Sequence, residues 1–320
     1  MTAPAWLITG GTGFFGREAI RQILAKSPDC KVRVFSRDER KQADLRAEFH
    51  WAVQAGRLIT IIGDVRDEAR VRQAVDGATY VLHAAALKRV EACQADVEEA
   101  IKTNVLGTVN VAKAAEWAGV WSAVLISSDK AANPVNSYGA SKLAAEHVML
   151  NAGRAWGPRA TRLMAVRYGN VVGSRGSVIE GWRSLPPGSS VPIRDPDATR
   201  FWLTIQDGVA LALWIAQYGR GCSLYVPSLK SASMGAVARA MGLVPGFTEA
   251  LFDAEKKHEC LLTEHEAMRA TMVAGAPMLL FEVPAPTGMS KVNVPALSPP
   301  LLSSDPRRFS DEELKALVAR

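Results

Sequence analysis

The stretch TGGTGFFGREAI, residues 9–20, comes directly after the apolar run WLI and decides the fold. Its glycines Gly10, Gly13 and Gly16 have the spacing of a tight turn that leads from a strand into a helix. Glycine lets such a turn bring its backbone close to a pyrophosphate, and the first amides of the helix supply hydrogen-bond donors. Because the turn lies between an apolar run and a helical pattern, the sequence predicts a dinucleotide-binding βαβ unit.

Outward from this turn, short β-branched runs alternate with longer helical patterns, which indicates a parallel sheet covered by helices. The expected strands are residues 6–9, 31–35, 58–62, 80–83, 122–127 and 163–168. The expected helices are residues 16–26, 37–49, 67–75, 97–117 and 138–151. The predicted fold class is therefore α/β, a Rossmann-type doubly wound parallel sheet with a smaller carboxy-terminal α/β lobe for the substrate.

The alternation ends after Tyr168, where Gly, Ser and Pro become frequent. We expect a dinucleotide-binding Rossmann domain in residues 1–168, with room for the sheet to regain segments around residues 200–228. Residues 169–320 are expected to form mainly the substrate-binding lobe and a carboxy-terminal cover.

The end of the chain shows two further patterns. Residues 277–306 are rich in proline and are interpreted as an extended cover or linker. Beyond them, Ser310 and Glu313 have the spacing of a capping box, which predicts a terminal helix.

Length, charge and cysteine content exclude several classes of protein. The 320 residues with 48% hydrophobic content can bury a large core, which excludes a disordered chain. The formal charge of +6 is not gathered into a basic tract, so we expect phosphate-bearing small molecules and not nucleic acid as partners. Four scattered cysteines without a C-x-x-C pair suggest a reducing compartment. With no basic leader and no apolar run of about 18 residues, we predict a cytoplasmic protein without membrane contacts.

The residues after the second expected strand indicate which of two dinucleotides, NAD or NADP, the protein binds. An NAD-binding protein usually offers one acidic side chain there to the ribose hydroxyls. This chain has Ser36, Arg37 and Asp38, followed by Lys41, and two cations with a hydroxyl can hold a 2′-phosphate. NADP is the predicted cofactor, and NAD stays possible because Asp38 can still serve its ribose.

Small or polar residues after the later strands complete the expected cofactor site. Asp64 follows the third strand, and three alanines follow the fourth, where the backbone must approach the cofactor. The predicted cofactor-binding residues are Gly10, Thr12, Gly13, Phe14, Phe15, Gly16, Ser36, Arg37, Asp38, Lys41, Asp64, Val65, Ala84, Ala85, Ala86, Lys88, Thr103, Tyr138 and Lys142.

Two pairs of side chains carry the predicted chemistry. Tyr138 and Lys142 lie four residues apart on one helix face, where cationic charge from the lysine and an oxidised nicotinamide would lower the pKa of the phenol. Asp129 and Lys130 follow the fifth strand, at the edge of the sheet where ligands bind. If burial moved both pKa values toward neutrality, Asp129 would donate a proton while a neutral Lys130 removed one from carbon.

Several motifs together resemble one family. The segments TGGTGFFG, FSRDERKQ, GDVRD, HAAALKRVE, IKTNVLGT, SSDKAANPVNSYGASK, VRYGNVVGSRGSV and TRFWLT are similar to the inverting UDP-N-acetylglucosamine 4,6-dehydratases that start pseudaminic acid synthesis. These enzymes are extended short-chain dehydrogenase/reductases. The resemblance runs from residue 5 to about residue 230, and its Asp-Lys and Tyr-x-x-x-Lys block is far more specific than a glycine turn.

The resemblance implies a hydro-lyase reaction. Tyr138, supported by Lys142, would help oxidise carbon 4 while NADP takes the hydride. Lys130 would remove the proton at carbon 5, and Asp129, next to Ser128, would protonate the departing hydroxyl at carbon 6. Return of the hydride to carbon 6 and reprotonation of carbon 5 from the opposite face would give UDP-2-acetamido-2,6-dideoxy-β-L-arabino-hex-4-ulose.

Two positions separate this family from its neighbours. Retaining 4,6-dehydratases typically carry Asp-Glu where this chain has Asp129 and Lys130, so the lysine favours inversion. A branch toward L-fucosamine precursors usually has Met where this chain has Tyr138. The substrate-binding residues implied by the resemblance are Lys88, Asn170, Ser177, Val178, Thr199, Arg200 and Glu255, with Arg200 as the diphosphate partner.

The carboxy-terminal lobe departs from the family pattern. The family segment R-P-G-E-K-x-H-E corresponds here to residues 252–259, with Phe252 in place of an arginine that would grip the nucleotide. Loss of a bidentate cation is not conservative at a phosphate site. Either Lys256, Lys257 or a neighbouring arginine substitutes, or the nucleotide differs from UDP, or the activity has drifted.

Other interpretations stay open. A sugar-nucleotide 4-epimerase or 4-ketoreductase would need Tyr138 and Lys142 but no Asp-Lys pair. The same dehydration on a different nucleotide sugar and a non-catalytic NADP-binding protein are further alternatives. The cluster of His258, Glu259, Cys260 and His265 matches no common ligand spacing, so no metal is predicted. The resemblance also implies a homo-oligomer, a dimer or larger, through helices near residues 97–117 and 138–151.

Overall fold

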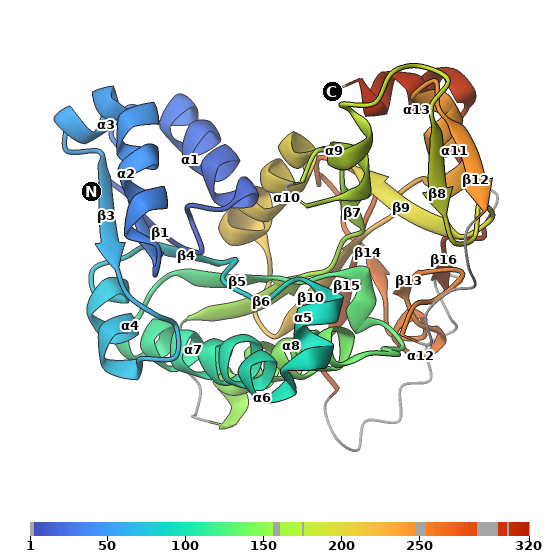
Figure 1. The fold of residues 1–320 in the computed structure, drawn as a ribbon. Helices are drawn as coiled ribbons and strands as arrows, with labels where there is room; N and C mark the ends of the chain where they lie inside the picture. Colours follow the sequence, from blue (N-terminus) through green and yellow to red (C-terminus); the bar gives the residue numbers. More distant parts are fainter. Residues whose placement is uncertain are drawn as a thin grey trace.

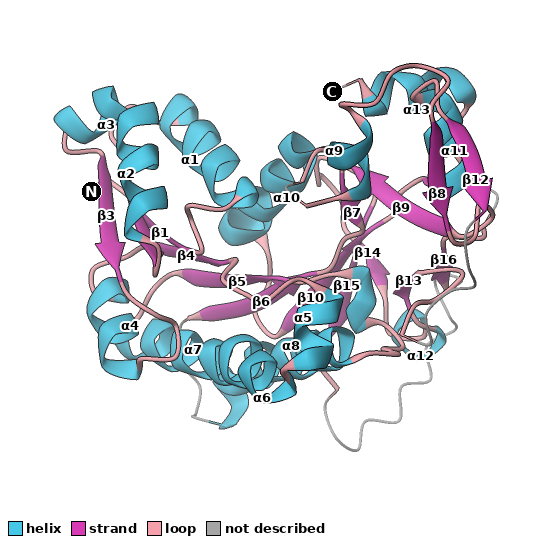
Figure 2. Cartoon of the chain, in the orientation of Figure 1, coloured by secondary structure: helices cyan, strands magenta, loops and turns pink. Residues whose placement is uncertain are grey.

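The computed structural model describes residues 3–155, 161–174, 176–247, 254–286, 300–305 and 307–319. A nine-stranded sheet crosses the molecule, with a layer of helices on each face (Figures 1 and 2). Across the sheet the strands are β14 (Thr271–Met272), β15 (Leu280–Pro284), β10 (Ser223–Pro227), β6 (Arg162–Val166), β5 (Ser122–Ile126), β4 (Tyr80–His83), β1 (Ala5–Thr9), β2 (Lys31–Ser36) and β3 (Leu58–Ile62).

The strands from β3 to β10 are parallel, and β15 and β14 add an antiparallel edge. All five residues of β1 are buried, as expected of a parallel strand covered on both faces. From β3 the order runs β3-β2-β1-β4-β5-β6, so the direction of winding reverses between β1 and β4. That reversal leaves a crevice at the carboxyl ends of the two strands, and the predicted doubly wound α/β fold is confirmed.

Helices cover the sheet in two groups. On one face lie α4, α7 and α8, and on the other lie α1, α2 and α10 (Figure 1). The helices of the sheet region are α1 (Phe14–Lys26), α2 (Glu39–Glu48), α3 (His50–Gln54), α4 (Glu68–Val75), α5 (Val90–Ala95), α6 (Val97–Ala100), α7 (Gly107–Ala118), α8 (Ser137–Ala155) and α10 (Ile205–Tyr218). Each group buries an apolar stripe against alternate side chains of the strands, because successive strand residues face opposite sides.

The helix predicted over residues 97–117 is interrupted. Between α6 and α7 the chain forms a π-helical turn, Ile101–Leu106, which buries Thr103 and Asn104. Single π-helical turns often occur at functional sites, because the extra residue redirects side chains that a regular helix would turn away. Hydrophobic periodicity over a long window does not reveal one extra residue, so the interruption was missed.

The proline-rich carboxy-terminal segment is more structured than predicted. Leu280–Pro284 is not a linker but strand β15, which pairs with β10 and is buried at Leu280, Phe281 and Val283. The carboxylate of Glu282 accepts a hydrogen bond of 2.7 Å from the Ser223 hydroxyl. Proline content alone misled the interpretation, because the apolar run between the prolines fits a buried strand.

The remaining elements form a lobe beside the sheet, at the right in Figure 1. It contains three small sheets, β7-β9-β11, β8-β12 and β13-β16, and its own apolar cluster. Its strands are β7 (Asn170–Val171), β8 (Ser190–Ile193), β9 (Thr199–Leu203), β11 (Ser231–Ser233), β12 (Val244–Phe247), β13 (Cys260–Leu262) and β16 (Leu301–Leu302). Its helices are α9 (Val178–Trp182), α11 (Met234–Ala240), α12 (Glu264–Ala267) and α13 (Asp311–Val318). The capping box predicted for Ser310 and Glu313 is confirmed at the start of α13. The domain boundary at residue 168 stays a prediction. Beyond that residue the chain returns to the central sheet with β10, β14 and β15.

Candidate active site

A cavity of about 550 Å³ lies where the strand order reverses. Of the predicted cofactor residues, Gly16 and Lys142 are not among those that line it. The predicted residues that do are Gly10, Thr12, Gly13, Phe14, Phe15, Ser36, Arg37, Asp38, Lys41, Asp64, Val65, Ala84, Ala85, Ala86, Lys88, Thr103 and Tyr138. Lining residues that sequence reasoning did not propose as cofactor-binding are Phe35, Gly63, Ser127, Ser128, Tyr168, Gly169, Val171, Ser174 and Ile205.

The glycine turn shapes one wall of the cavity. Gly10 has φ +67°, and a Cβ there would lie 2.8 Å from the backbone nitrogen of Ala85. A Cβ on Gly16 would overlap the backbone of Gly11, so glycine lets α1 start directly against the turn. The N-cap residue of α1 is Gly13, which has no side chain to accept hydrogen bonds. The first amides of α1 are therefore available to a ligand. The buried Thr103 hydroxyl also lacks a hydrogen-bond partner, so this cavity fits a dinucleotide.

The ribose end of the cavity combines cations with a helix cap. Asp38 caps α2 by accepting a 3.0 Å hydrogen bond from the Lys41 amide, and its carboxylate lies 2.9 Å from the Lys41 ammonium. These hydrogen bonds hold the pKa of Asp38 below its usual value. Arg37 lies 3.5 Å from the Asp64 carboxylate, and the side chains of Arg37 and Lys41 are about half exposed. Asp38 thus caps α2 while it lines the cavity together with Arg37 and Lys41, and each of the two cations lies beside a carboxylate.

The acid and amine predicted to transfer protons lie just after β5. Ser128 caps a 3₁₀ turn, Asp129–Ala131, and its hydroxyl donates a 2.9 Å hydrogen bond to the Asp129 carboxylate. Asp129 is fully buried, and its second carboxylate oxygen has no partner. The Lys130 ammonium lies 2.9 Å from Asp129 and 2.8 Å from the side-chain oxygen of Asn170. The fold thus brings together three catalytic candidates, Ser128, Asp129 and Lys130, and one substrate-binding candidate, Asn170.

The pKa values of this pair differ from the prediction in one respect. Burial raises the pKa of Asp129, which agrees with the direction expected for a proton donor. Burial lowers the pKa of Lys130, but the carboxylates of Asp129 and Glu259 outweigh burial and raise it above its usual value. The expected shift of Lys130 toward neutrality was wrong, because Asp129 opposes burial most strongly and Glu259, which lies 3.4 Å away, adds to its effect.

Burial and nearby positive charge act in opposite directions on the pKa of Tyr138. Burial of the phenol raises its pKa to about 12, although Lys130 and a hydrogen bond with Ser128 favour the phenolate. Lys142 donates a 2.7 Å hydrogen bond to the Ile126 carbonyl, and burial lowers its own pKa to about 8. Among the charges of the protein, Lys130 is therefore the main support for the phenolate, and not Lys142 as the helical spacing predicted.

The substrate-side candidates are spread over the lobe. Lys88 lines the cavity, Ser177 caps α9, and Val178 begins that helix with a partly exposed side chain. Arg200 donates hydrogen bonds to the carbonyls of Thr199 (2.9 Å) and Lys257 (3.1 Å).

Thr199 and Glu255 are held by protein partners. The Thr199 hydroxyl is buried between the His258 ring, at 2.8 Å, and the Ser303 hydroxyl, at 2.7 Å. Glu255 lies 3.5 Å from Arg194. The position of Phe252, where the family pattern has arginine, lies outside the described residues.

One functional candidate that sequence reasoning left without a role is Glu259. It is 3% exposed and lies within reach of Lys130, Lys256 and Arg200. The family-like segment at residues 252–259 drew attention to it, but nothing local shows that a carboxylate from the lobe reaches a lysine at the sheet edge.

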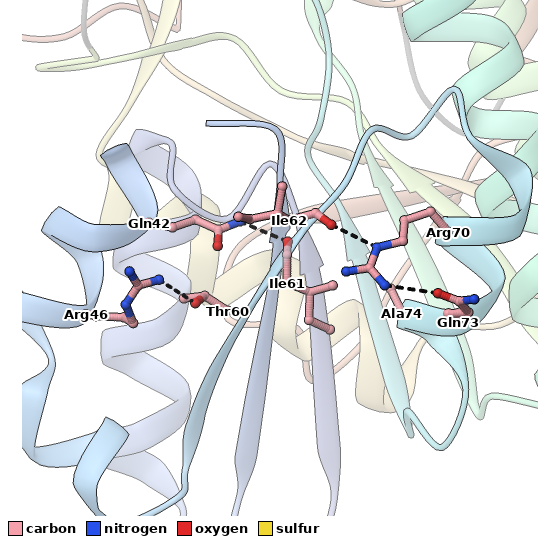
Figure 3. A pocket seen from close by; sticks show the side chains of 8 residues that line it. All are labelled: Gln42, Arg46, Thr60, Ile61, Ile62, Arg70, Gln73 and Ala74. Carbon is pink, nitrogen blue, oxygen red and sulfur yellow. Dashed lines mark hydrogen bonds between the residues drawn. The ribbon is translucent and has the colours of Figure 1, made fainter. Parts of the chain in front are cut away.

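A second pocket, of about 460 Å³, lies at the outer edge of the sheet, beside β3 (Figure 3). Its polar side chains bond to the protein: Arg46 to the Thr60 hydroxyl, Gln42 to the Ile61 carbonyl, and Arg70 to the Ile62 carbonyl. These bonds cover part of the edge of β3, which is a structural role.

The helices of the described ranges were also compared with the length and apolar character that a membrane span requires. None of these described helices meets both requirements.

Comparisons with known proteins agree with this geometry. The family described as "Polysaccharide biosynthesis protein" matches residues 6–276. A UDP-N-acetylglucosamine 4,6-dehydratase (inverting) of Campylobacter jejuni subsp. jejuni serotype O:23/36 (strain 81-176) is 37% identical over 266 residues, 82% of this chain and 78% of the relative. A UDP-glucose 4-epimerase of Rickettsia prowazekii (strain Madrid E) is 35% identical over 328 residues, 98% of this chain and 94% of the relative.

Among solved structures, the chain is similar to Pen from Bacillus thuringiensis. The TM-score is 0.88 and the sequence identity 31%, with 100% of this chain and 99% of that chain covered. The likeness therefore extends over the sheet and the lobe alike.

Proposed function

The chain belongs to the polysaccharide biosynthesis protein family, among the extended short-chain dehydrogenase/reductases, and from this premise we propose that it is an inverting nucleotide-sugar 4,6-dehydratase acting on UDP-N-acetylglucosamine. It is a hydro-lyase that binds a nicotinamide dinucleotide in the 550 Å³ cavity. The product is the 4-keto-6-deoxy sugar nucleotide with inverted carbon 5.

The observation that carries this proposal is the pair formed by the fully buried Asp129 and the largely buried Lys130, whose side chain is 19% exposed, beside Tyr138. A 4-epimerase moves hydride at carbon 4 and needs no acid and base for carbons 5 and 6. Burying an amine against a carboxylate costs desolvation energy, so such a pair is weak support for stability and better explained by chemistry.

Each residue of the site has a distinct task. When bound, the nicotinamide supplies reversible hydride transfer. Tyr138 accepts the proton of the carbon-4 hydroxyl as that carbon becomes a ketone, which makes the proton at carbon 5 acidic. Lys130 takes that proton and Asp129 protonates the carbon-6 hydroxyl, so that water leaves and a double bond forms between carbons 5 and 6. Carbon 6 then takes back the hydride that left carbon 4, and Lys130 returns a proton to carbon 5 from the opposite face, so that the double bond is saturated.

The Asp129–Lys130 pair reaches its reactive form by moving one proton. In the resting site the pair is an ammonium and a carboxylate 2.9 Å apart. Transfer of the proton from Lys130 Nζ to Asp129 Oδ1 gives a neutral base and a protonated acid, the two forms that elimination requires. After elimination the pair is again an ammonium and a carboxylate, which supplies the proton for carbon 5.

The test is incubation of the holoenzyme with UDP-N-acetylglucosamine in deuterated water, followed by NMR and mass spectrometry. The expected product is a 4-keto-6-deoxy sugar nucleotide with deuterium at carbon 5 and the L-arabino configuration. Interconversion of 4-epimers without loss of water would overturn the proposal. That outcome would support the second candidate, a 4-epimerase, which is favoured by the epimerase relative's coverage of 98% of this chain.

Three finer features belong to the same proposal. NADP is the cofactor, supported by Arg37 and Lys41 at the ribose end of the cavity. Arg194 and Arg200 hold the diphosphate in place of the arginine that Phe252 replaces. The protein is a cytoplasmic homo-oligomer, and three exposed apolar side chains, Val97, Ile101 and Leu106, lie on the helices that we expect at the interface.

A further inference from the structure

Glu259 lies at the end of the lobe segment 254–259, beside the proton-transfer pair. Its side chain is 3% exposed, and its carboxylate lies 3.4 Å from Lys130, 3.1 Å from Lys256 and 3.9 Å from Arg200. It is thus a buried anion at the centre of three cations, and one of these is the lysine that handles the carbon-5 proton.

The segment that carries Glu259 is fixed at both ends. At its start, the Asn136 amide donates a 2.8 Å hydrogen bond to the Ala254 carbonyl, and the Lys256 ammonium donates one of 2.8 Å to the Ala132 carbonyl. At its end, the Ser303 hydroxyl accepts from the Glu259 amide at 2.7 Å, and the Ser303 amide donates to the Glu259 carbonyl at 2.9 Å. The carboxylate therefore keeps its place against Lys130.

We propose that Glu259 is a positioning residue that sets the proton occupancy of the Asp129–Lys130 pair from the carboxy-terminal lobe. This inference rests on the proposed dehydratase function, because it concerns the pair that performs the elimination. The pair is reactive when it holds one proton, and a fixed negative charge next to it makes that proton harder to lose.

The surrounding charges support a constant negative charge on Glu259. Burial raises its pKa, but Lys130, Lys256 and Arg200 outweigh burial and hold the pKa at about 2. The pair itself also faces the phenol of Tyr138, whose pKa burial raises, and the uncharged amide of Asn170. Glu259 is consequently the lobe's ionised carboxylate at the pair throughout the working pH range.

The direction of the effect follows from charge alone. A neighbouring anion favours the ammonium form of Lys130 and disfavours the carboxylate form of Asp129, so it raises both pKa values. Replacing Glu259 by a neutral isostere must lower both. The pH range in which the pair holds one proton then moves as a whole toward lower pH.

The experiment compares wild-type holoenzyme with Glu259→Gln and Glu259→Asp, measuring turnover of UDP-N-acetylglucosamine across pH. For Glu259→Gln we expect both limbs of the pH–rate profile to shift to lower pH by about one unit. Turnover at neutral pH should fall about tenfold or more. Glu259→Asp keeps the charge and should restore most of the profile. The matched control is Glu264→Gln, the same change at an exposed position of the lobe, which should leave both limbs in place.

A second readout does not depend on turnover. Trace labelling of lysines with acetic anhydride across pH, read by mass spectrometry on the Lys130 peptide, reports the pKa of that amine directly. We expect the pKa of Lys130 to fall in Glu259→Gln and to stay near the wild-type value in Glu259→Asp. The aspartate variant also provides a measurement if the glutamine variant fails to fold. A lower rate with unmoved limbs and an unmoved Lys130 titration would overturn the inference. If wild type turned over no UDP-N-acetylglucosamine, the proposed substrate would fail while the labelling still decided the role of Glu259.

Discussion

The cofactor cavity and the proton-transfer centre adjoin each other but are made in different ways. The cavity is largely backbone: a glycine turn, the first amides of α1 and the alanines after β4, all short segments that follow strands of one sheet. The proton-transfer centre is made of side chains, with Asp129 and Lys130 from the sheet, Asn170 from β7 and Glu259 from the lobe. A backbone site depends on shape, whereas a side-chain site depends on charges that distant segments supply.

The largest effect is expected at the proton-transfer centre. Lys130→Met removes the amine that takes the carbon-5 proton, so dehydration should fall by about 10² to 10⁴. Oxidation at carbon 4, followed by the absorbance of the reduced nicotinamide in a single turnover, should persist, because Tyr138 is unchanged. Lys113→Met, an exposed lysine on α7, is the control. Unchanged incorporation of deuterium at carbon 5 in Lys130→Met would contradict the role of the amine.

The next largest effect concerns the connection between the sheet region and the lobe, which holds the lobe carboxylate beside the sheet. Arg167 is fully buried and pairs with Glu146 of α8 at 2.6 Å and Glu266 of α12 at 2.8 Å. Arg167→Met leaves the Glu146 carboxylate buried without its partner, so the free energy of unfolding should fall by about 3–5 kcal/mol. Urea unfolding measures this loss. Arg239→Met, at an exposed site of α11, should change stability little, and equal losses in the two variants would argue against the buried network.

A smaller effect tests the backbone nature of the cavity. Gly16→Ala places a methyl group against the backbone of Gly11, which should cost about 1–3 kcal/mol of unfolding free energy. It should also weaken dinucleotide binding, measured by titration calorimetry. Gly181→Ala, where a Cβ meets open space within α9, is the matched control and should be neutral or slightly stabilising. Undisturbed binding in Gly16→Ala would show that the turn tolerates the added methyl.

The smallest effect concerns the choice of dinucleotide. Arg37→Ala should weaken NADP binding about tenfold and leave NAD binding nearly unchanged, because an exposed cation on a 2′-phosphate is worth about 1.4 kcal/mol. Equilibrium titration with both dinucleotides measures the ratio. Arg40→Ala, at an exposed arginine in the first turn of α2 that does not line the cavity, should change neither affinity. Equal losses for NAD and NADP in Arg37→Ala would remove the argument for NADP.

Sequence reasoning succeeded where a residue's role depends on its own neighbours along the chain. The turn from Gly10 to Gly16 lines or supports the cavity, and the cap at Ser310 forms as predicted. It failed where the role depends on contacts from far away. The pKa of Lys130 is raised where a shift toward neutrality was expected, because Asp129 and, from the distant lobe, Glu259 outweigh burial.

The sequence by itself determined the α/β fold, the position of the dinucleotide turn and the residue types of the acid and base. Local spacing carries these features, because strands, turns and caps are specified by residues a few positions apart. The tertiary structure alone decided the charge state of the centre, the π-helical turn that buries Thr103 and the place of Leu280–Pro284 in the sheet. These features arise from contacts between residues distant in sequence, and electrostatic shifts in a buried site depend on distances that only the folded chain sets.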